Sequence, residues 1–197
     1  PQGTKAGQDI LREHLIFEIG TYVHVLFQNL CERAGVMEAR EAEVVNHSLK
    51  IVGHADGILK IDGERSLLEI KTIGSRGFTD LRTVKDHHKR QVTCYMKELG
   101  LTKALVVYIC KDRSQCREFG VDFELGYWER YVKDRIASYF VRMPRRIPPA
   151  REGLSAGTIP CVSCAFKQVC YDSQCSQRFL NKIRPKLKLK YVQRSTT

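Results

Sequence analysis

Three charged residues in the middle of the chain could bind a divalent cation and handle a water molecule. They are Asp56, Glu69 and Lys71, and Glu69 and Lys71 are separated by a single residue. Carboxylate oxygens are the ligands that Mg²⁺ and Mn²⁺ prefer, and a lysine ammonium can orient a nucleophilic water or help to deprotonate it. These residue types fit hydrolysis of a phosphodiester bond, and we take all three as candidate catalytic residues.

Short β-rich runs surround these residues. They fall at 44–45, 51–52, 57–61 and 67–73, and Asp62-Gly63 separates the last two. Asp-Gly between such runs predicts a hairpin with a type I′ turn, because both central positions need positive φ. With a two-residue loop, Ile61 faces Glu64, and counting outward brings Asp56 directly opposite Glu69. Glu69 and Lys71 leave the same face of their strand.

Helices and further strands are predicted around this β-meander. Apolar residues recur at three- and four-residue steps from 7 to about 35, which predicts a buried amphipathic helix that ends near Gly35. A helix is predicted at 87–99, strands at 104–110 and 119–123, and a last helix at 124–141. The order is α, β-meander, α, ββ, α, which indicates an α/β fold.

Three further features strengthen the catalytic interpretation. The strand that carries Glu69 is largely apolar, so we expect it to be central in the sheet. Charged residues are rarely buried there unless they have a functional or structural role. Gln91 and Tyr95 stand one helical turn apart and share a helix face. His24 lies among apolar neighbours and its imidazole could complete a metal shell. Taken singly, such residues more often belong to an ordinary helix surface or core.

The motif order Gly20-x-x-x-His24, Gly53-His54-Ala55-Asp56-Gly57, Glu69-Ile70-Lys71 and Gln91-x-x-x-Tyr95 resembles that of RecB-type nucleases of the PD-(D/E)XK superfamily, over about residues 20–95. The resemblance implies a restriction-endonuclease-like core with a mixed central sheet flanked by helices. It implies that His24, Asp56 and Glu69 bind Mg²⁺ or Mn²⁺, with the Ile70 carbonyl as a further ligand. Lys71 would position the attacking water, and Gln91 and Tyr95 would contact DNA.

The family favours exonuclease action on single-stranded DNA ends. The resemblance therefore implies a role in DNA repair or a related process, with helicase, recombination or CRISPR-adaptation proteins as partners. Two alternatives stand beside this hypothesis. The chain could be a nucleic-acid-binding module without catalysis, or a scaffold subunit of a larger assembly, in either case with a structural zinc site.

A cysteine cluster, Cys161-x-x-Cys164-x5-Cys170, indicates soft-metal ligation. It resembles the triplet that holds a [4Fe-4S] cluster in RecB-type exonucleases such as the CRISPR-associated nuclease, the AddB nuclease domain and the exonuclease V group. In those proteins a fourth cysteine lies upstream of the motif histidine, but no cysteine precedes His24 here. The fourth ligand is then Cys175, Cys31 or a residue upstream of Pro1, unless the four C-terminal cysteines bind Zn²⁺ instead. We expect the cluster to be structural.

The charge of the chain favours a polyanionic partner. The 197 residues include 33 Lys and Arg against 22 Asp and Glu, a net charge of +11. No acidic residue follows Asp172, and the tail reads as a phosphate-binding arm, although a solvated terminus would have the same composition. The candidate DNA-binding residues of the tail are Lys182, Arg184, Lys186 and Lys188.

Composition also limits the class of protein. No apolar run reaches the roughly 18 residues of a membrane helix, and no secretory signal is recognised, so we expect a soluble, intracellular protein. Eight cysteines in so long a chain do not suggest a disulfide scaffold, and Cys94, Cys110 and Cys116 are expected to be ordinary packing or surface thiols. The predicted organisation is a nuclease core at 1–143, a linker and cysteine-cluster segment at 144–178, and a basic tail at 179–197.

Overall fold

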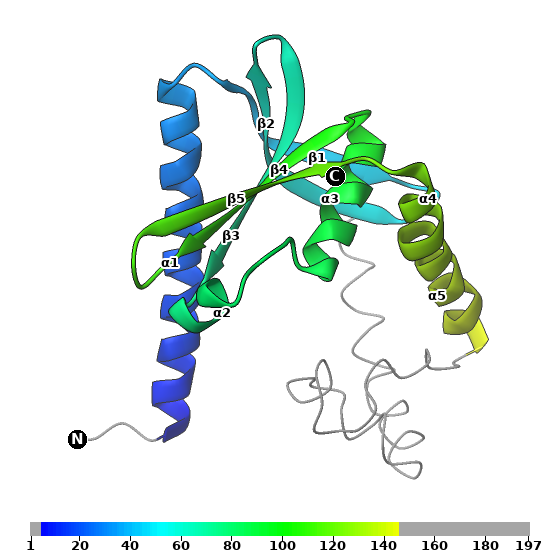
Figure 1. Cartoon of the computed structure of the whole chain (residues 1–197). Helices are drawn as coiled ribbons and strands as arrows, with labels where there is room; N and C mark the ends of the chain where they lie inside the picture. Colours follow the sequence, from blue (N-terminus) through cyan, green and yellow to red (C-terminus); the bar gives the residue numbers. More distant parts are fainter. Residues whose placement is uncertain (1–4, 146–197) are drawn as a thin grey trace, which may run out of the picture. The chain divides into compact units, whose positions relative to one another are not determined.

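The computed structural model describes the backbone of residues 5–145, and the chain divides into two compact units, Pro1–Ala137 and Ser138–Thr197. A five-stranded sheet with flanking helices makes up the described part of the first unit (Figure 1). Its elements are α1 (Lys5–Arg33), β1 (Met37–Asn46), β2 (Ile51–Ile61), β3 (Glu64–Ile73), α2 (Ser75–Thr79), α3 (Asp86–Leu99), β4 (Lys103–Cys110), β5 (Gln115–Asp122), α4 (Leu125–Tyr127), a π-helix η1 (Trp128–Lys133) and the start of α5 (Asp134–Arg145).

The strands follow one another across the sheet in chain order, β1-β2-β3-β4-β5. All neighbours are antiparallel except β3 and β4, which run parallel because α2 and α3 carry the chain back between them. The sheet is therefore mixed, and β3, which carries Glu69 and Lys71, is its central strand. Both features were predicted.

The hairpin between β2 and β3 has the predicted turn. Asp62 and Gly63 adopt positive φ angles of 52° and 84°, as a type I′ turn requires. Ile61 pairs with Glu64, and the pairing continues in this register to Gly57 opposite Leu68. The alternation of side chains along β3 is fixed from this turn.

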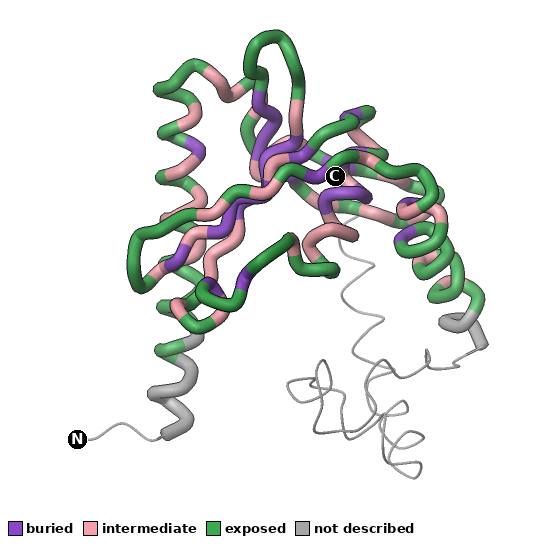
Figure 2. The backbone as a smooth tube through the Cα atoms, in the orientation of Figure 1, coloured by how far each residue is buried: buried purple, intermediate pink, exposed green. Residues whose placement is uncertain are grey.

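Each face of the sheet has its own apolar core. On one face Leu67, Val106 and Tyr108 pack with Val92 and Met96 of α3. On the other face, a cluster of Leu59, Leu68, Ile70 and Val107 packs against side chains of α1, including Phe27 and Cys31. Figure 2 shows the buried residues gathered along the middle of the sheet. The sheet is thus a rigid platform between α1 and α3.

Helix α1 differs from its prediction in exposure, although not in extent. It ends at Arg33, and Gly35 follows with a φ of 71°, the left-handed conformation of a helix terminus. The apolar face predicted to be buried is largely exposed in the described part of the helix, however, with Phe17 at 73%, Tyr22 at 71% and Leu26 at 57%. The periodicity identified the helix, but only some of its apolar side chains, such as Phe27 and Cys31, pack against the described sheet.

Other boundaries also moved. The runs predicted at 51–52 and 57–61 are parts of one strand, β2, and β5 begins at Gln115 rather than at 119. The short helix α2 was not predicted. The last helical segment, predicted to end at 141, continues to Arg145 and so includes Pro144, which was assigned to the linker.

Several predictions concern residues outside the described range. They are the linker beyond 145, the cysteines Cys161, Cys164, Cys170 and Cys175, and the basic residues Lys182, Arg184, Lys186 and Lys188. The predicted domain boundaries likewise remain predictions. Among the helices that the structure describes, none combines the length and the hydropathy needed to cross a membrane.

Candidate active site

The sheet is interrupted at Asp56. Strands β1 and β2 pair at Arg40 with Gly57 and again at Ala42 with Ala55, and the position between, Glu41 opposite Asp56, is skipped. Glu41 has a positive φ of 47°, which is unusual for a residue with a side chain. On the other edge of β2, the pairing with β3 stops one residue before Asp56 and Glu69 would meet.

This interruption also shifts the faces of β2. Ala55 and Ile58 lie in the same core cluster although a regular strand would turn them to opposite faces. Asp56 therefore has no partner in the described β-ladders on either side, and its backbone and side chain can form hydrogen bonds with other groups.

Three elements hold Asp56 in place. Its Oδ1 lies 3.0 Å from Nδ1 of His24 in α1, and its Oδ2 accepts a hydrogen bond of 2.5 Å from the backbone N–H of Ile70 in β3. Its backbone carbonyl accepts a hydrogen bond of 2.8 Å from Nε2 of Gln28, also in α1. The structure thus brings His24 and Asp56 together, as the motif series implied.

Gln28 connects this aspartate to β1. The side chain is 1% exposed, and its Nε2 also donates to Oε1 of Glu41 at 2.6 Å, while its Oε1 accepts from Nε of Arg40 at 3.1 Å. A buried amide with its donors and acceptor engaged fixes the separation of α1, β1 and β2. The sequence analysis missed Gln28, although its position one helical turn after His24 places both side chains on one face.

Glu69 is buried, and one of its two carboxylate oxygens has no hydrogen-bond partner in the part of the chain that the structure describes. It is 2% exposed, its Oε1 accepts a hydrogen bond of 2.5 Å from Nζ of Lys71, and its buried Oε2 has no hydrogen-bond partner among the described residues. Burial raises the pKa of Glu69 to about 7; the positive charge of Lys71 opposes the rise and the negative charge of Asp56 adds to it. A bound cation would stabilise the charged form of this buried carboxylate, because one of its oxygens lacks a hydrogen-bond partner within the described residues.

The donor set fits a hard divalent cation. Adjacent ligands of an octahedral Mg²⁺ at about 2.1 Å from the ion are about 3 Å apart, the separation of His24 Nδ1 and Asp56 Oδ1. The unpartnered Oε2 of Glu69 is a third available donor. Among the described residues, no group of three His, Cys, Asp or Glu side chains converges closely enough to hold a metal ion. Lys71 engages Oε1 of Glu69, so Oε2 is the oxygen that this carboxylate can offer to a cation.

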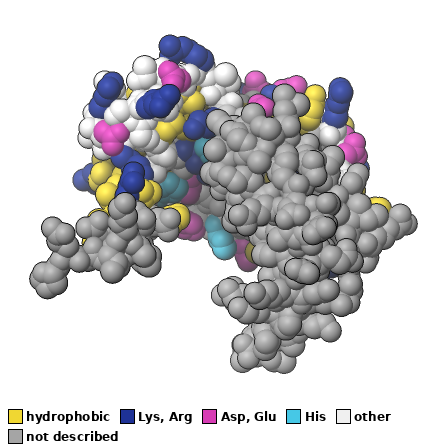
Figure 3. Space-filling view, turned by 90° about the horizontal axis from the view of Figure 1, so that it is seen from below, with side chains coloured by type: hydrophobic (Ala, Val, Ile, Leu, Met, Phe, Trp, Pro, Cys, Tyr) yellow, Lys and Arg dark blue, Asp and Glu magenta, His cyan; other side chains and the backbone are white. Residues whose placement is uncertain are grey.

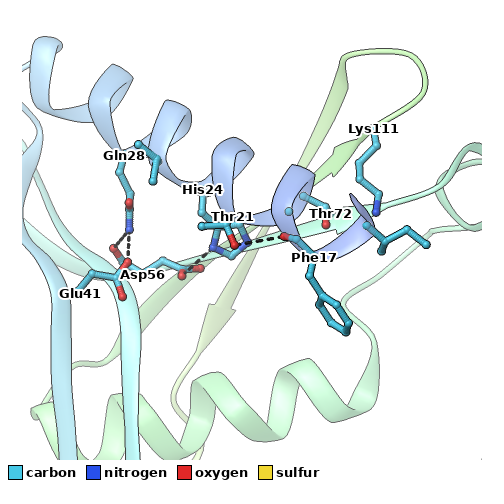
Figure 4. A pocket seen from close by; sticks show the side chains of 11 residues that line it. Phe17, Thr21, His24, Gln28, Glu41, Asp56, Thr72 and Lys111 are labelled. Atoms are coloured by element: carbon cyan, nitrogen blue, oxygen red, sulfur yellow. Dashed lines mark hydrogen bonds and ion pairs between the residues drawn. The ribbon is translucent and has the colours of Figure 1, made fainter. Parts of the chain in front are cut away.

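A cleft of about 430 Å³ opens in front of Asp56 and His24. It runs between α1 and the sheet, and Thr72 and Lys111 line its other end (Figure 4). Glu69 and Lys71 do not line it, because their side chains leave the opposite face of β3. Viewed from below in Figure 3, histidine and acidic side chains are visible near Lys and Arg side chains at the described surface.

Comparison with known proteins identifies the fold and its relatives. No protein-family model matches the chain. The chain is 37% identical over 113 residues to the CRISPR-associated exonuclease Cas4 of Saccharolobus solfataricus, a match that covers 57% of the chain and 54% of the relative. The chain thus spans about half the length of that curated protein.

Two solved structures share the fold. The crystal structure of SSO0001 has a TM-score of 0.51 at 21% identity, over 77% of this chain and 68% of that one. An alkaline exonuclease from Laribacter hongkongensis, LHK-Exo, has a TM-score of 0.52 at 12% identity, over 66% of this chain and 69% of that one. The sequence similarity to Cas4 and the shared fold agree with the resemblance to RecB-type nucleases of the PD-(D/E)XK superfamily that the motif series predicted.

The Gln91–Tyr95 pair lies as the helix period predicted. Nε2 of Gln91 is 3.3 Å from the hydroxyl of Tyr95 on the same face of α3. The ring of Tyr95 lies against Gly53, where an added Cβ would be only 2.5 Å from its hydroxyl. Gly53 is therefore needed for this ring position. Contact of the pair with DNA stays a prediction.

A histidine–tyrosine pair that the sequence analysis did not identify lies behind Lys71. The hydroxyl of Tyr108, the residue paired with Lys71 across β3 and β4, accepts from the backbone N–H of Lys85 at 3.1 Å and lies 2.6 Å from Nδ1 of His88. Because burial lowers the pKa of His88 to about 3, with the nearby charges of His87 and Lys71 adding to the effect, the imidazole is neutral. Tyr108 and His88 therefore share a hydrogen bond between two neutral side chains.

Cys31, one of the alternatives for a fourth cluster ligand, has the surroundings of a packing residue. Its side chain is half-buried against the cluster of Leu59, Leu68, Ile70 and Val107, and burial raises its thiol pKa. Cys94 and Cys110 are buried and Cys116 is exposed, all as free thiols, which is consistent with the absence of any assigned role.

Proposed function

We propose that this chain is a divalent-metal-dependent deoxyribonuclease that hydrolyses phosphodiester bonds, and that it acts as an exonuclease. The observation that carries the proposal is the buried Glu69, whose Oε2 has no partner and whose pKa is raised to about 7, beside the aspartate that His24 contacts. A carboxylate with a strongly raised pKa, close to a second carboxylate, is a mark of functional sites. The RecB-like family provides the class of reaction.

His24, Asp56 and Glu69 would hold Mg²⁺ or Mn²⁺. The cation, when bound, supplies positive charge at the scissile phosphate and lowers the pKa of water. Gln28 fixes the Asp56 backbone, so that its carboxylate stays directed toward His24. Lys71, 2.5 Å from Glu69, holds an ammonium at the site where it can orient the nucleophilic water.

The substrate we propose is DNA with a single-stranded end. The similar protein from Saccharolobus solfataricus is named an exonuclease, and so is LHK-Exo. The net charge of +11 favours a phosphate backbone. Gln91 and Tyr95 would contact the strand, together with the basic residues Lys182, Arg184, Lys186 and Lys188. Partners in repair, recombination or CRISPR adaptation follow from the same resemblance, and an intracellular location goes with such a substrate.

For the cysteine cluster we propose a structural [4Fe-4S] group rather than Zn²⁺. The support is the spacing Cys161-x-x-Cys164-x5-Cys170, which matches the iron–sulfur branch of the family. With Cys31 packed in the core, Cys175 or an upstream residue is the better fourth ligand. A broad visible absorption band that bleaches on reduction would support iron–sulfur, and a colourless protein that contains stoichiometric zinc would refute it.

Cleavage of a 5′-labelled single-stranded oligonucleotide tests the proposed activity. We expect Mn²⁺-dependent shortening that is lost in Glu69→Gln and in Lys71→Met by at least a hundredfold. The matched controls are Glu64→Gln and Lys103→Met. They break an exposed ion pair between the first residues of β3 and β4 and should leave the cleavage rate unchanged.

The alternative, a binding module without catalysis, predicts the other result. Oligonucleotide binding would persist while wild-type protein and all four variants show no metal-dependent cleavage. Uniform background cleavage, equal in the wild type and in Glu69→Gln, would also reject the assignment of these residues.

A further inference from the structure

The cleft in front of Asp56 has a second end that the proposed chemistry does not use. Lys111 lies there, directly after β4, and its backbone N–H donates to the carbonyl of Ile73 at 3.0 Å. This hydrogen bond holds Lys111 beside the end of β3, next to Thr72. Figure 4 shows both side chains at the end of the cleft away from Gln28.

The Lys111 ammonium is available to a ligand. Among the described residues it forms no salt bridge. Together with hydrogen bonds from Ser75, the larger cause, its charge lowers the pKa of the next residue, Asp112, but the carboxylate of Asp112 forms its hydrogen bonds with Ser75. Oδ2 of Asp112 accepts hydrogen bonds of 2.6 Å from both the backbone N–H and the hydroxyl of Ser75. An unpaired lysine in a cleft, with its neighbouring carboxylate turned to another partner, is suited to an anion.

The wall opposite Thr72 carries no side chain. Gly20 of α1 faces Thr72, and a Cβ built at Gly20 would already lie 3.6 Å from the threonine hydroxyl oxygen. A larger residue at this position would fill the end of the cleft. The space beside the Thr72 hydroxyl therefore stays open because residue 20 is glycine.

An exposed aromatic ring completes this end. Phe17 lines the cleft and is 73% exposed. Tyr22, on the same helix, is 71% exposed but does not line the cleft. Phe17 is thus an apolar ring in water beside an unpaired cation, the combination on which single-stranded nucleic acid binds through base stacking and phosphate contact.

We propose that Lys111, Thr72 and Phe17 form a binding site for the nucleotide that adjoins the scissile phosphate. Lys111 and the Thr72 hydroxyl bind its phosphate, and its base stacks on Phe17. Stacking on a side chain requires an unpaired base, so this site selects a single strand. The cleft volume of about 430 Å³ falls in the range of about 300–1,000 Å³ that holds one small ligand. The proposal rests on the proposed nuclease function for the neighbouring scissile phosphate.

The test measures binding without cleavage. Fluorescence anisotropy of a labelled oligothymidylate is recorded with the full chain in excess chelator, over a series of salt concentrations. Lys111→Met should weaken binding and reduce the slope of log affinity against log salt by about 0.7, the value for one phosphate contact on a single strand. The matched control is Lys97→Met, which removes the same charge from the exposed surface of α3.

The aromatic contact has its own matched pair. Phe17→Leu should weaken binding of the single strand about fivefold or more, as loss of one base stack predicts, and should leave binding of a blunt duplex unchanged. Tyr22→Leu should change neither. Phe17→Tyr and Lys111→Arg, which keep the ring and the charge, should restore wild-type binding and so exclude misfolding.

Equal effects of Lys111→Met and Lys97→Met, or of Phe17→Leu and Tyr22→Leu, would overturn the site. This outcome is independent of the proposed catalysis, because no cleavage takes place in chelator. Conversely, specific loss of binding in these variants, together with wild-type cleavage by Glu69→Gln, would retain the site and reject the catalytic assignment.

Discussion

Glu69→Gln is expected to stabilise the metal-free protein at neutral and alkaline pH while it abolishes cleavage. The carboxyl group is 2% exposed, and burial raises its pKa from 4.5 to about 7. The folded state thus binds this proton more tightly than the unfolded chain does. The wild type keeps the corresponding stability below pH 4.5 and loses it as the pH rises to about 7.

The magnitude follows from the two values. The difference between 4.5 and about 7 corresponds to up to about 3 kcal/mol of unfolding free energy, because each pH unit is worth 1.36 kcal/mol. Glutamine has the same shape and does not ionise, so the variant avoids this loss. Urea unfolding in chelator at pH 5 and pH 8 measures it: the advantage of the variant should be small at pH 5 and largest at pH 8.

Glu64→Gln is the control, since Glu64 is exposed and its pKa is lowered by a hydrogen bond from Lys103. It should give no gain at pH 8. Mn²⁺ at one thousand times its dissociation constant should make the wild type more stable than Glu69→Gln at pH 8, because it stabilises the wild type by about 4.1 kcal/mol. A Glu69→Gln advantage that does not change between pH 5 and pH 8 would refute the reasoning.

Three further substitutions test the supports of the site. Gln28→Leu should destabilise the fold by about 1–3 kcal/mol, because it leaves the buried hydrogen-bond partners of Gln28 unpaired, and it should lower the cleavage rate. Unchanged stability and rate would show that these hydrogen bonds do not support the site. Gly53→Ala should lower the free energy of unfolding, measured with urea, by about 1–3 kcal/mol, because the added Cβ would collide with the ring of Tyr95. An unchanged free energy of unfolding would contradict this tight packing. His88→Gln should still form a hydrogen bond with Tyr108 but removes a titrating group. Because the pKa of His88 falls from 6.5 to about 3, the wild type loses stability as the pH falls through this range. After a discount for the partial solvent exposure of His88, the variant should be about 2 kcal/mol less acid-sensitive at pH 4; parallel acid unfolding curves would exclude a neutral imidazole.

The sequence was sufficient for the framework of the site. The Asp62-Gly63 turn set the register of β2 and β3, and the apolar residues around Glu69 identified the central strand. These signals are local, since a two-residue turn and side-chain alternation depend on neighbouring residues only.

The parts that could not be predicted depend on long-range contacts. Counting along regular strands placed Asp56 opposite Glu69, but the ladder ends before this pair because Asp56 instead contacts His24 and Ile70. The burial of Gln28 follows from three-dimensional neighbours on β1 and β2, which helix period alone does not reveal. Periodicity likewise cannot tell whether an apolar helix face is covered, and most of the described apolar face of α1 is not.

Titration calorimetry of Mn²⁺ into the wild type and Asp56→Asn is the most direct measurement of the central claim. The account predicts a site in the wild type whose affinity falls at least tenfold in the variant, because the carboxylate beside His24 is then neutral. Indistinguishable binding isotherms for the two proteins would contradict it.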